Sequence, residues 1–144
     1  MLLGIEGGNI VGKDRIWFTK FQANGDRLWT RIIDFDSSLA DLAKGITIDD
    51  FDNIYITGES RKGNPLNGQT DVFLAKYNVD GSLLWTQDFG TSANDGVENL
   101  TLDRNGNLYL TGSTLSGLNG QNQGSGDAWV AKFNDIENSD RFRR

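Results

Sequence analysis

The sequence predicts an all-β protein built from repeated four-stranded antiparallel units. Lys20, Lys76 and Lys132 stand 56 residues apart in matching motifs, and Tyr55 and Tyr109 stand 54 residues apart in a second motif that alternates with the first. A period near 50 residues is typical of proteins that stack one supersecondary unit on the next. No segment combines helix caps with apolar residues at the i, i+3, i+4, i+7 spacing of an amphipathic helix.

The longer repeated motif predicts a β-hairpin. Its second copy, at 71–89, reads DVFLAKYNVDGSLLWTQDF, with apolar runs on either side of Asp80-Gly81. Glycine tolerates the positive φ of a tight turn, and aspartate caps such a turn through its own side chain. Asn24-Gly25 occupies the same place in the first copy, at 15–35. Both copies should therefore fold back on themselves.

The shorter motif predicts a second hairpin in each period. It reads ITIDDFDNIYITG at 46–58 and LTLDRNGNLYLTG at 100–112, and Gly58 and Gly112 are expected to end its return strand. The residues at 93–98 are expected to form a turn. Two hairpins in each period give four short strands, enough for one antiparallel sheet.

The arrangement of these sheets follows from their apolar runs. Val72-Phe73-Leu74-Ala75 lacks the alternation of a half-buried strand, so both faces of its sheet should be covered. A radial stack of four-stranded antiparallel sheets is a β-propeller, and the sequence predicts about two and a half such blades. We assign 1–13 to the end of a preceding blade, 14–134 to two repeats plus one strand of a third, and 135–144 to a charged C-terminal tail. The strand at 127–134 is a candidate for completing a blade in a partner chain.

From about 14 to 134 the chain resembles the SBBP-type repeat, a bacterial family of β-propeller repeats, most completely in its second period. The matching residues, in order, are Asp71, Lys76, Asp80, Gly81, Leu84, Trp85, Gly90, Asp95, Asp103, Gly106, Asn107, Tyr109, Thr111 and Gly112. The first period departs from the pattern at Arg15, Asp36 and Phe51-Asp52. The resemblance implies a propeller that serves as an interaction platform, often within larger bacterial surface or secreted proteins, with no shared catalytic residues.

Composition excludes several classes of function. A net charge of −6 would repel nucleic-acid phosphates, and no basic stripe interleaves with aromatic residues. The chain has no cysteine and no histidine, which removes disulfides, zinc–thiolate sites and imidazole catalysis. No apolar run approaches the roughly 18–20 residues that cross a membrane, and the start MLLGIEGGN lacks the features of a signal peptide. An extracellular or cell-surface location is suggested by the resemblance alone.

Two polar loops are candidates for ligand contact. They span 59–70 and 113–126 and follow the shorter hairpin in both periods, and repeat proteins often bind through such variable loops. The alternative is that they are flexible connections. They contain no aromatic residue, which disfavours sugar stacking. The candidate ligand-binding residues are Asn64, Asn67, Gln69, Asn119, Gln121 and Asn122.

A calcium site is a further candidate. Asp103, Asn105 and Asn107 place oxygen side chains at alternate positions, as in looped Ca²⁺ sites. Thr114 stands where such loops carry a glutamate, and Phe51 interrupts the pattern in the first period. The alternative is a hairpin turn, where asparagine and glycine are favoured in any case.

Recurring residues are expected to be structural. Carboxylates recur at matching positions: Asp34 and Asp88, Asp41 and Asp95, and Asp49 and Asp103. A catalytic pair should break the repeat, whereas a turn cap should follow it. The repeated lysines should pack their stems and bring their ammonium groups to a carboxylate or carbonyl. Repeated aromatics should pack between blades, as Trp29 and Trp85, or in the core, as Trp17, Phe73 and Trp129.

These observations favour a non-catalytic propeller module that acts as a scaffold for a protein or small ligand. It would be completed as a homo-oligomer or by additional blades of a longer chain. The alternatives are a carbohydrate- or calcium-binding propeller and, less favoured, a carboxylate-dependent hydrolase.

Overall fold

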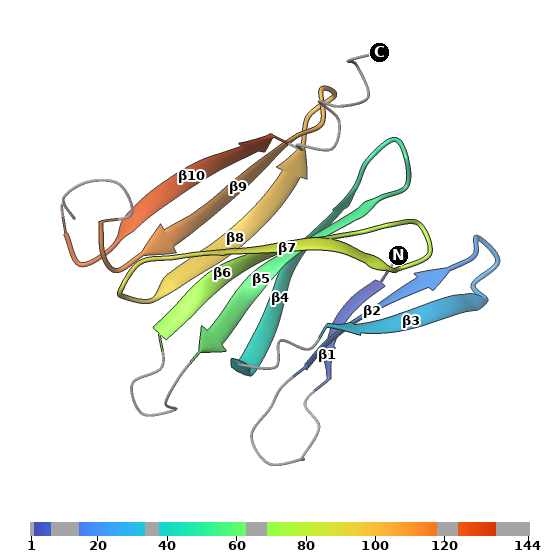
Figure 1. Cartoon of the computed structure of the whole chain (residues 1–144), viewed down its shortest axis with the longest axis horizontal. Helices are drawn as coiled ribbons and strands as arrows, with labels where there is room; N and C mark the ends of the chain where they lie inside the picture. Colours follow the sequence, from blue (N-terminus) through green and yellow to red (C-terminus); the bar gives the residue numbers. More distant parts are fainter. Residues whose placement is uncertain (1, 7–14, 34–37, 63–68, 118–123, 135–144) are drawn as a thin grey trace.

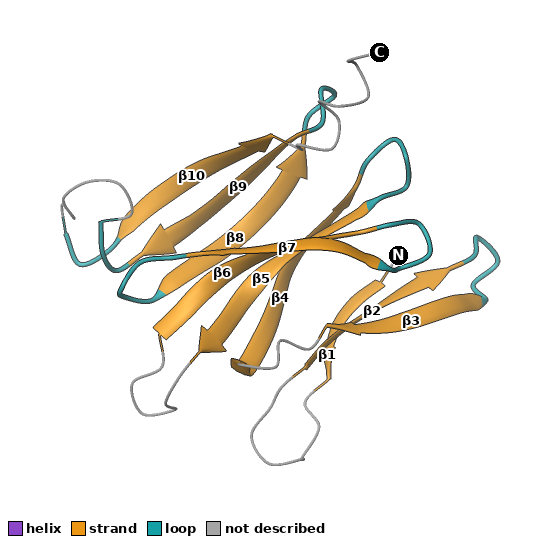
Figure 2. Cartoon of the chain, in the orientation of Figure 1, coloured by secondary structure: helices purple, strands orange, loops and turns teal. Residues whose placement is uncertain are grey.

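The computed structural model describes residues 2–6, 15–33, 38–62, 69–117 and 124–134. Their regular structure is entirely β-strand (Figure 2). The strands are β1 Leu2–Glu6, β2 Arg15–Phe21, β3 Arg27–Ile33, β4 Ser38–Ile48, β5 Ile54–Lys62, β6 Gln69–Tyr77, β7 Leu83–Phe89, β8 Asp95–Leu102, β9 Asn107–Thr114 and β10 Asp127–Asn134.

The strands form three antiparallel sheets, in the orders β1-β2-β3, β4-β5-β6-β7 and β10-β9-β8 (Figure 1). The central sheet is a complete four-stranded blade made of a short hairpin, β4–β5, and a long hairpin, β6–β7. By position in the repeat, β1–β3 correspond to β5–β7, and β8–β10 correspond to β4–β6. The all-β, propeller-type architecture is thus confirmed, and the ten strands among the described residues are divided three, four and three.

The sheet boundaries differ from the division expected from the sequence. β1, assigned to the end of a preceding blade, pairs with β2 from Leu2↔Thr19 to Glu6↔Arg15. β10, considered as a strand for a partner chain, instead pairs with β9 of its own chain from Asp127↔Thr114 to Asn134↔Asn107. The tail assigned to 135–144 lies outside the described residues.

Two hydrophobic cores lie on either side of the central sheet. The side chains of β6 alternate between them: Phe73 and Ala75 pack toward β2 and β3, and Val72 and Leu74 pack toward β8, β9 and β10. All four side chains are buried, so the expectation that both faces are covered is confirmed. Full burial of one such large aliphatic or aromatic side chain stabilises the fold by about 1.5–3 kcal/mol.

Gly58 and Gly112 do not end their strands, contrary to the expectation from the sequence. β5 continues to Lys62 and β9 to Thr114. A Cβ atom on Gly58 would lie 2.1 Å from the Leu42 carbonyl oxygen and 2.7 Å from the Phe73 ring. Gly112 is enclosed in the same way, with the Trp129 ring at 2.4 Å. Glycine is required here because a bulged neighbouring strand and a cross-strand ring approach the backbone closely.

The strands also extend into segments expected to be loops. β8 begins at Asp95, so most of 93–98 is strand rather than turn. The segment 59–70 contributes its first residues to β5 and its last to β6, and 113–126 begins with the end of β9. Polar side chains at these strand ends do not prevent backbone pairing, because pairing uses only the main-chain groups.

Candidate functional site

The β4–β5 turn is held by one aspartate. The backbone N–H groups of Phe51 and Asn53 donate to Asp49 Oδ1 at 2.9 and 2.8 Å. The side-chain amide of Asn53 and the hydroxyl of Tyr55 donate to Asp49 Oδ2 at 2.8 and 3.2 Å. Four donors therefore converge on a single carboxylate.

The β8–β9 turn repeats this arrangement around Asp103. The N–H groups of Asn105 and Asn107 donate to its Oδ1 at 2.8 and 2.9 Å. The Asn107 amide and the Tyr109 hydroxyl donate to its Oδ2 at 2.7 and 3.3 Å. The Asn107 side-chain hydrogen bond, aided by the backbone donors, lowers the pKa of Asp103 below its ordinary value. The structural role expected for this recurring aspartate pair is confirmed.

These contacts bear on the expected calcium site. Asp103 and Asn107 hydrogen-bond each other, so a cation at Asp103, Asn105 and Asn107 would have to compete with the turn's own donors. Within the part of the chain that the structure describes, no group of three or more acidic, histidine or cysteine side chains is placed to hold a metal ion. Calcium binding at this turn stays a prediction.

The other recurring carboxylates occupy matching environments where the structure describes them. Asp41 and Asp95 are both buried, and Asp95 Oδ2 accepts a hydrogen bond from the Thr91 N–H. Asp88 is exposed, and Asp34 lies outside the described residues. A shared environment at matching positions is the mark of a structural part of each blade.

Lys20 has the carbonyl partner expected of the recurring lysines, whereas Lys76 and Lys132 each place the ammonium near a tyrosine ring. Lys76 is buried, with its ammonium 5.2 Å from the centroid of the Tyr55 ring. Lys20 is half-buried and donates to the Val79 carbonyl oxygen at 3.5 Å. Lys132 lies 5.6 Å from the Tyr109 ring centroid but is exposed, because no further sheet covers it among the described residues.

The recurring tryptophans pack between sheets, as expected. Trp29 packs against the core between the first and central sheets, and Trp85 packs against the core between the central and third sheets. Phe73 and Trp129 are buried in those cores, whereas Trp17 is only half-buried. The exposure of Trp17 places it near an uncovered face of the first sheet.

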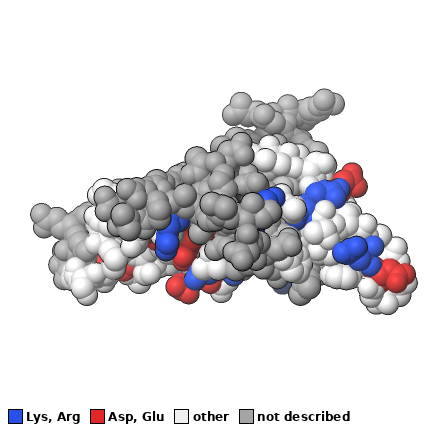
Figure 3. All heavy atoms as spheres, turned by 90° about the horizontal axis from the view of Figure 1, so that it is seen from below, with Lys and Arg blue, Asp and Glu red and all other residues white. Residues whose placement is uncertain are grey.

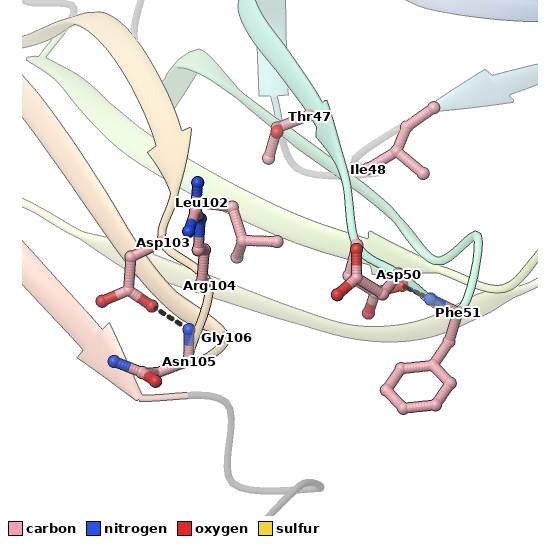
Figure 4. Close-up of a pocket in the computed structure, with 10 residues that line it drawn as sticks. Thr47, Ile48, Asp50, Phe51, Leu102, Asp103, Arg104, Asn105 and Gly106 are labelled. Carbon is pink, nitrogen blue, oxygen red and sulfur yellow. Dashed lines mark hydrogen bonds between the residues drawn. The ribbon is translucent and has the colours of Figure 1, made fainter.

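A pocket of about 550 Å³ lies between the β4–β5 and β8–β9 turns. Figure 4 shows the two turns facing each other across it, with Asp50 and Phe51 on one and Arg104 and Asn105 on the other. It is lined by Thr47, Ile48, Asp49, Asp50, Phe51, Leu102, Asp103, Arg104, Asn105 and Gly106.

The two walls of the pocket come from equivalent turns but differ in chemistry. Asp50 stands where the other turn has Arg104, and Phe51 stands where it has Asn105. Asp52 takes a positive φ of 62° at the position of Gly106, a conformation that is uncommon for residues other than glycine. Phe51 is 60% exposed. The pocket thus combines an aromatic ring with groups of opposite charge.

Of the predicted ligand residues, the structure describes Gln69, which does not line this pocket. Gln69 is exposed at the start of β6, and its side-chain amide donates to the Ser92 carbonyl oxygen. The other five predicted ligand residues, Asn64, Asn67, Asn119, Gln121 and Asn122, lie outside the described residues. Two of the predicted calcium ligands, Asp103 and Asn105, line the pocket.

The missed residues carried one signal in the sequence. The two periods disagree at Asp50 and Phe51, which face Arg104 and Asn105 in the alignment, whereas the flanking aspartate and asparagine repeat. A repeated residue is explained by the blade itself, so a disagreement within a well-matched turn marks a residue that the fold does not require.

The charged side chains visible in Figure 3 are interspersed, with basic and acidic groups adjacent to each other. The described residues visible on that face therefore form no broad patch of one sign for steering a charged partner. No helix among the described residues is long and apolar enough to span a membrane.

Comparisons with known proteins agree with the architecture. The chain is 26% identical over 129 residues to the uncharacterized WD repeat-containing protein L264 of Acanthamoeba polyphaga mimivirus. This alignment covers 76% of this chain and 9% of that protein. It is 28% identical over 109 residues to the regulatory protein FlaEY of Caulobacter vibrioides, covering 69% of this chain and 11% of that protein. The chain thus spans about a tenth of the length of these relatives.

The match to a family is located in the second period. Residues 84–119, which run from β7 through β8 and β9, match the family described as the SBBP beta-propeller repeat. This segment contains the Asp103 turn, Tyr109 and Gly112, whose structural roles are given above. Residues 84–119 are thus similar to the SBBP β-propeller repeat, as the sequence pattern of the second period indicates.

Proposed function

We propose that this protein is a non-catalytic β-propeller scaffold that binds a protein partner at the pocket between the β4–β5 and β8–β9 turns. The observation that carries the proposal is the exposed Phe51 ring on the same turn as Asp50, across the pocket from Arg104 (Figure 4). Aromatic and arginine side chains are enriched among the residues that dominate binding energy at protein interfaces. Phe51 and Arg104 occupy turn positions at which the two periods carry different residues, so the fold does not require either side chain.

The repeated ionisable groups support a non-catalytic role. The carboxylates of Asp49 and Asp103 each accept four hydrogen bonds within their own turns. The ammonium group of Lys76 is buried against the Tyr55 ring. General acid–base catalysis needs a group that can reach the substrate and exchange a proton with it. Groups committed to holding turns and sheets together are poorly suited to that task.

The chemistry of the pocket suggests the kind of segment that would bind. An extended loop with one apolar side chain could place it against Phe51. Flanking basic and acidic side chains would then meet Asp50 and Arg104 on opposite walls. A carbohydrate is the second candidate, because an exposed aromatic ring can stack on the apolar face of a sugar. The charged pair favours the protein partner.

Parallel screens of the same protein would separate these candidates. The wild-type chain is first probed on a random peptide array and on a glycan array. The variants Phe51→Ala, Arg104→Ala and Leu83→Ala are then probed on the same two arrays. Leu83 is 54% exposed on β7, away from the pocket, and serves as the matched control.

We expect saturable peptide binding that Phe51→Ala and Arg104→Ala each weaken by at least about tenfold, or about 1.4 kcal/mol, while Leu83→Ala leaves it unchanged. Glycan binding that depends on Phe51 would instead show that the pocket recognises carbohydrate. Binding that ignores both pocket variants would reject the pocket as the site.

A further inference from the structure

The central sheet shows how one blade of this protein recognises the next. Its β6 strand presents Leu74 and Lys76 to the third sheet, beside Tyr55 of β5, and all three side chains are buried there. Strands β8, β9 and β10 supply the cover. Each of these positions has an equivalent 54 or 56 residues later in the chain.

The equivalent positions on the third sheet are uncovered in the structure. We call this surface the β10 face and define it by Tyr109, Val130 and Lys132, which correspond to Tyr55, Leu74 and Lys76. Val130 is 73% exposed, although its counterpart Leu74 is fully buried. The intervening residues Trp129, Ala131 and Phe133 point the other way, into the core shared with the central sheet. The β10 face is therefore a blade-binding surface without a blade on it.

The complementary surface is visible where the first sheet meets the central one. Phe18 of β2 contacts Tyr77 with ring centroids 4.7 Å apart. Lys20 of β2 reaches the Val79 carbonyl oxygen in the β6–β7 turn. Arg31 of β3 donates to the Asp80 carbonyl oxygen in the same turn at 2.8 Å. A blade thus receives its neighbour on the end of β6 and the turn that follows.

The same receiving surface exists on the first sheet and is open. The β2–β3 turn has the same backbone hydrogen bonds as the β6–β7 turn, with the Gly25 N–H donating to the Gln22 carbonyl at 3.0 Å, as the Gly81 N–H donates to the Asn78 carbonyl at 2.9 Å. A Cβ atom on Gly81 would meet Arg31 at 2.9 Å, whereas one on Gly25 would meet nothing within 4 Å.

The exposure of Phe21 also differs between the first sheet and the equivalent position of the central sheet. Phe21 is 39% exposed, whereas its counterpart Tyr77 is 5% exposed beneath Phe18. We call the surface formed by Phe21 and the Gln22–Asp26 turn the β3 face. It is the receiving half of the blade interface, without a neighbour.

We propose that the β10 face of one copy of this chain binds the β3 face of a second copy. Val130 would pack on the second copy's Phe21, as Phe18 packs on Tyr77 within one chain. Lys132 would donate to the second copy's Ala23 carbonyl, as Lys20 donates to Val79. The occupant follows from the repeat, since each chain carries both halves of an interface that it already forms twice internally. The contact is head-to-tail, so each chain can bind two others.

Sedimentation analysis over a range of concentrations tests this with four proteins: wild type, Val130→Glu, Phe21→Glu and the control Leu83→Glu. Val130 and Phe21 are exposed in the single chain, so far-UV circular dichroism should show each variant folded. We expect wild type and Leu83→Glu to form assemblies that grow with concentration. Each of the two face variants alone should sediment near the monomer mass of 15.9 kDa.

The decisive measurement mixes the two face variants. Val130→Glu retains an intact β3 face and Phe21→Glu an intact β10 face, so their mixture should form a complex of twice 15.9 kDa and nothing larger. A mixture that stays monomeric, or assembly abolished by only one of the variants, would overturn the head-to-tail contact. A wild-type chain that stays monomeric throughout would reject the second copy as occupant, leaving further blades of a longer chain.

Cysteine cross-linking gives an independent check, because the chain has no cysteine of its own. Val130→Cys mixed with Phe21→Cys should yield a covalent dimer under mild oxidation, whereas either variant alone should yield none. A dimer from Val130→Cys alone would instead indicate a symmetric contact and contradict the proposal. None of these substitutions touches Phe51 or Arg104, so this test and the test of the pocket can fail separately.

Discussion

Gly58→Ala should be among the most destabilising single-methyl additions in this protein. The new Cβ atom would lie 2.1 Å from the Leu42 carbonyl oxygen and under 3 Å from the Phe73 ring, far inside ordinary van der Waals contact. The carbonyl lies just before the β4 bulge between Ala43 and Gly45, and the ring is fully buried, so neither neighbour can move without disturbing the core. Overpacking of a rigid core costs about 1–3 kcal/mol, and we expect the upper end of that range or above.

Urea denaturation followed by tryptophan fluorescence measures this effect. We expect Gly58→Ala to lower the free energy of unfolding by about 3 kcal/mol with little change in m-value. Gly124→Ala is the matched control, because nothing lies within 4 Å of its added Cβ and its φ is not positive. It should change stability by less than about 1 kcal/mol. Equal effects of the two substitutions, or a Gly58→Ala protein as stable as wild type, would refute the close-approach explanation.

Three further predictions concern ionisation and metal binding. The lowered pKa of Asp103 means that its hydrogen bonds stabilise the fold above about pH 4 and are lost as the pH falls through the folded-state pKa. Urea titrations should therefore show a steeper acid loss of stability in wild type than in Asp103→Asn, and equal slopes would contradict this. Burial raises the pKa of Tyr77 to about 12 from 10.0, so wild type should lose stability between those pH values. Tyr77→Phe should lose less over the same interval, and identical alkaline profiles would count against this assignment. Calcium should leave the melting temperature unchanged, because the Asp103 oxygens already accept four hydrogen bonds; a rise that Asn105→Ala abolishes would instead assign a calcium site to this turn.

The architecture could be predicted from the sequence because its signals are local and repeated. Gly25, Gly81 and Gly106 all adopt positive φ in the turns where a glycine-containing pair marks a hairpin. The uninterrupted apolar run in β6 indicated a sheet covered on both faces. Such features depend on a few neighbouring residues, which the sequence places side by side.

The errors have a common physical origin in contacts between distant residues. Gly58 resembles a strand terminator when only its neighbours along the chain are considered. Its role becomes clear only when the β4 bulge and the Phe73 ring approach it from two sides. The pocket was missed for the same reason, since it requires the turns after β4 and β8 to lie across from each other. A period in the sequence makes these turns equivalent but does not make them neighbours in space.

The repeat separates residues that build the blade from residues that are available for recognition. Asp49 and Asp103 have the same partners in both turns, so their chemistry is accounted for by the fold. Phe51 differs from its counterpart and projects from a turn that does not need it. Val130 is the opposite case, because the equivalent position is buried in the central sheet, whereas no sheet among the described residues covers Val130. Where equivalent positions carry different residues, as at Phe51, the difference suggests a ligand-binding surface. Where equivalent positions differ in burial, as at Val130, the difference suggests an assembly surface. The two surfaces are distinct, so this chain can bind a partner at its turns while its end faces engage further blades.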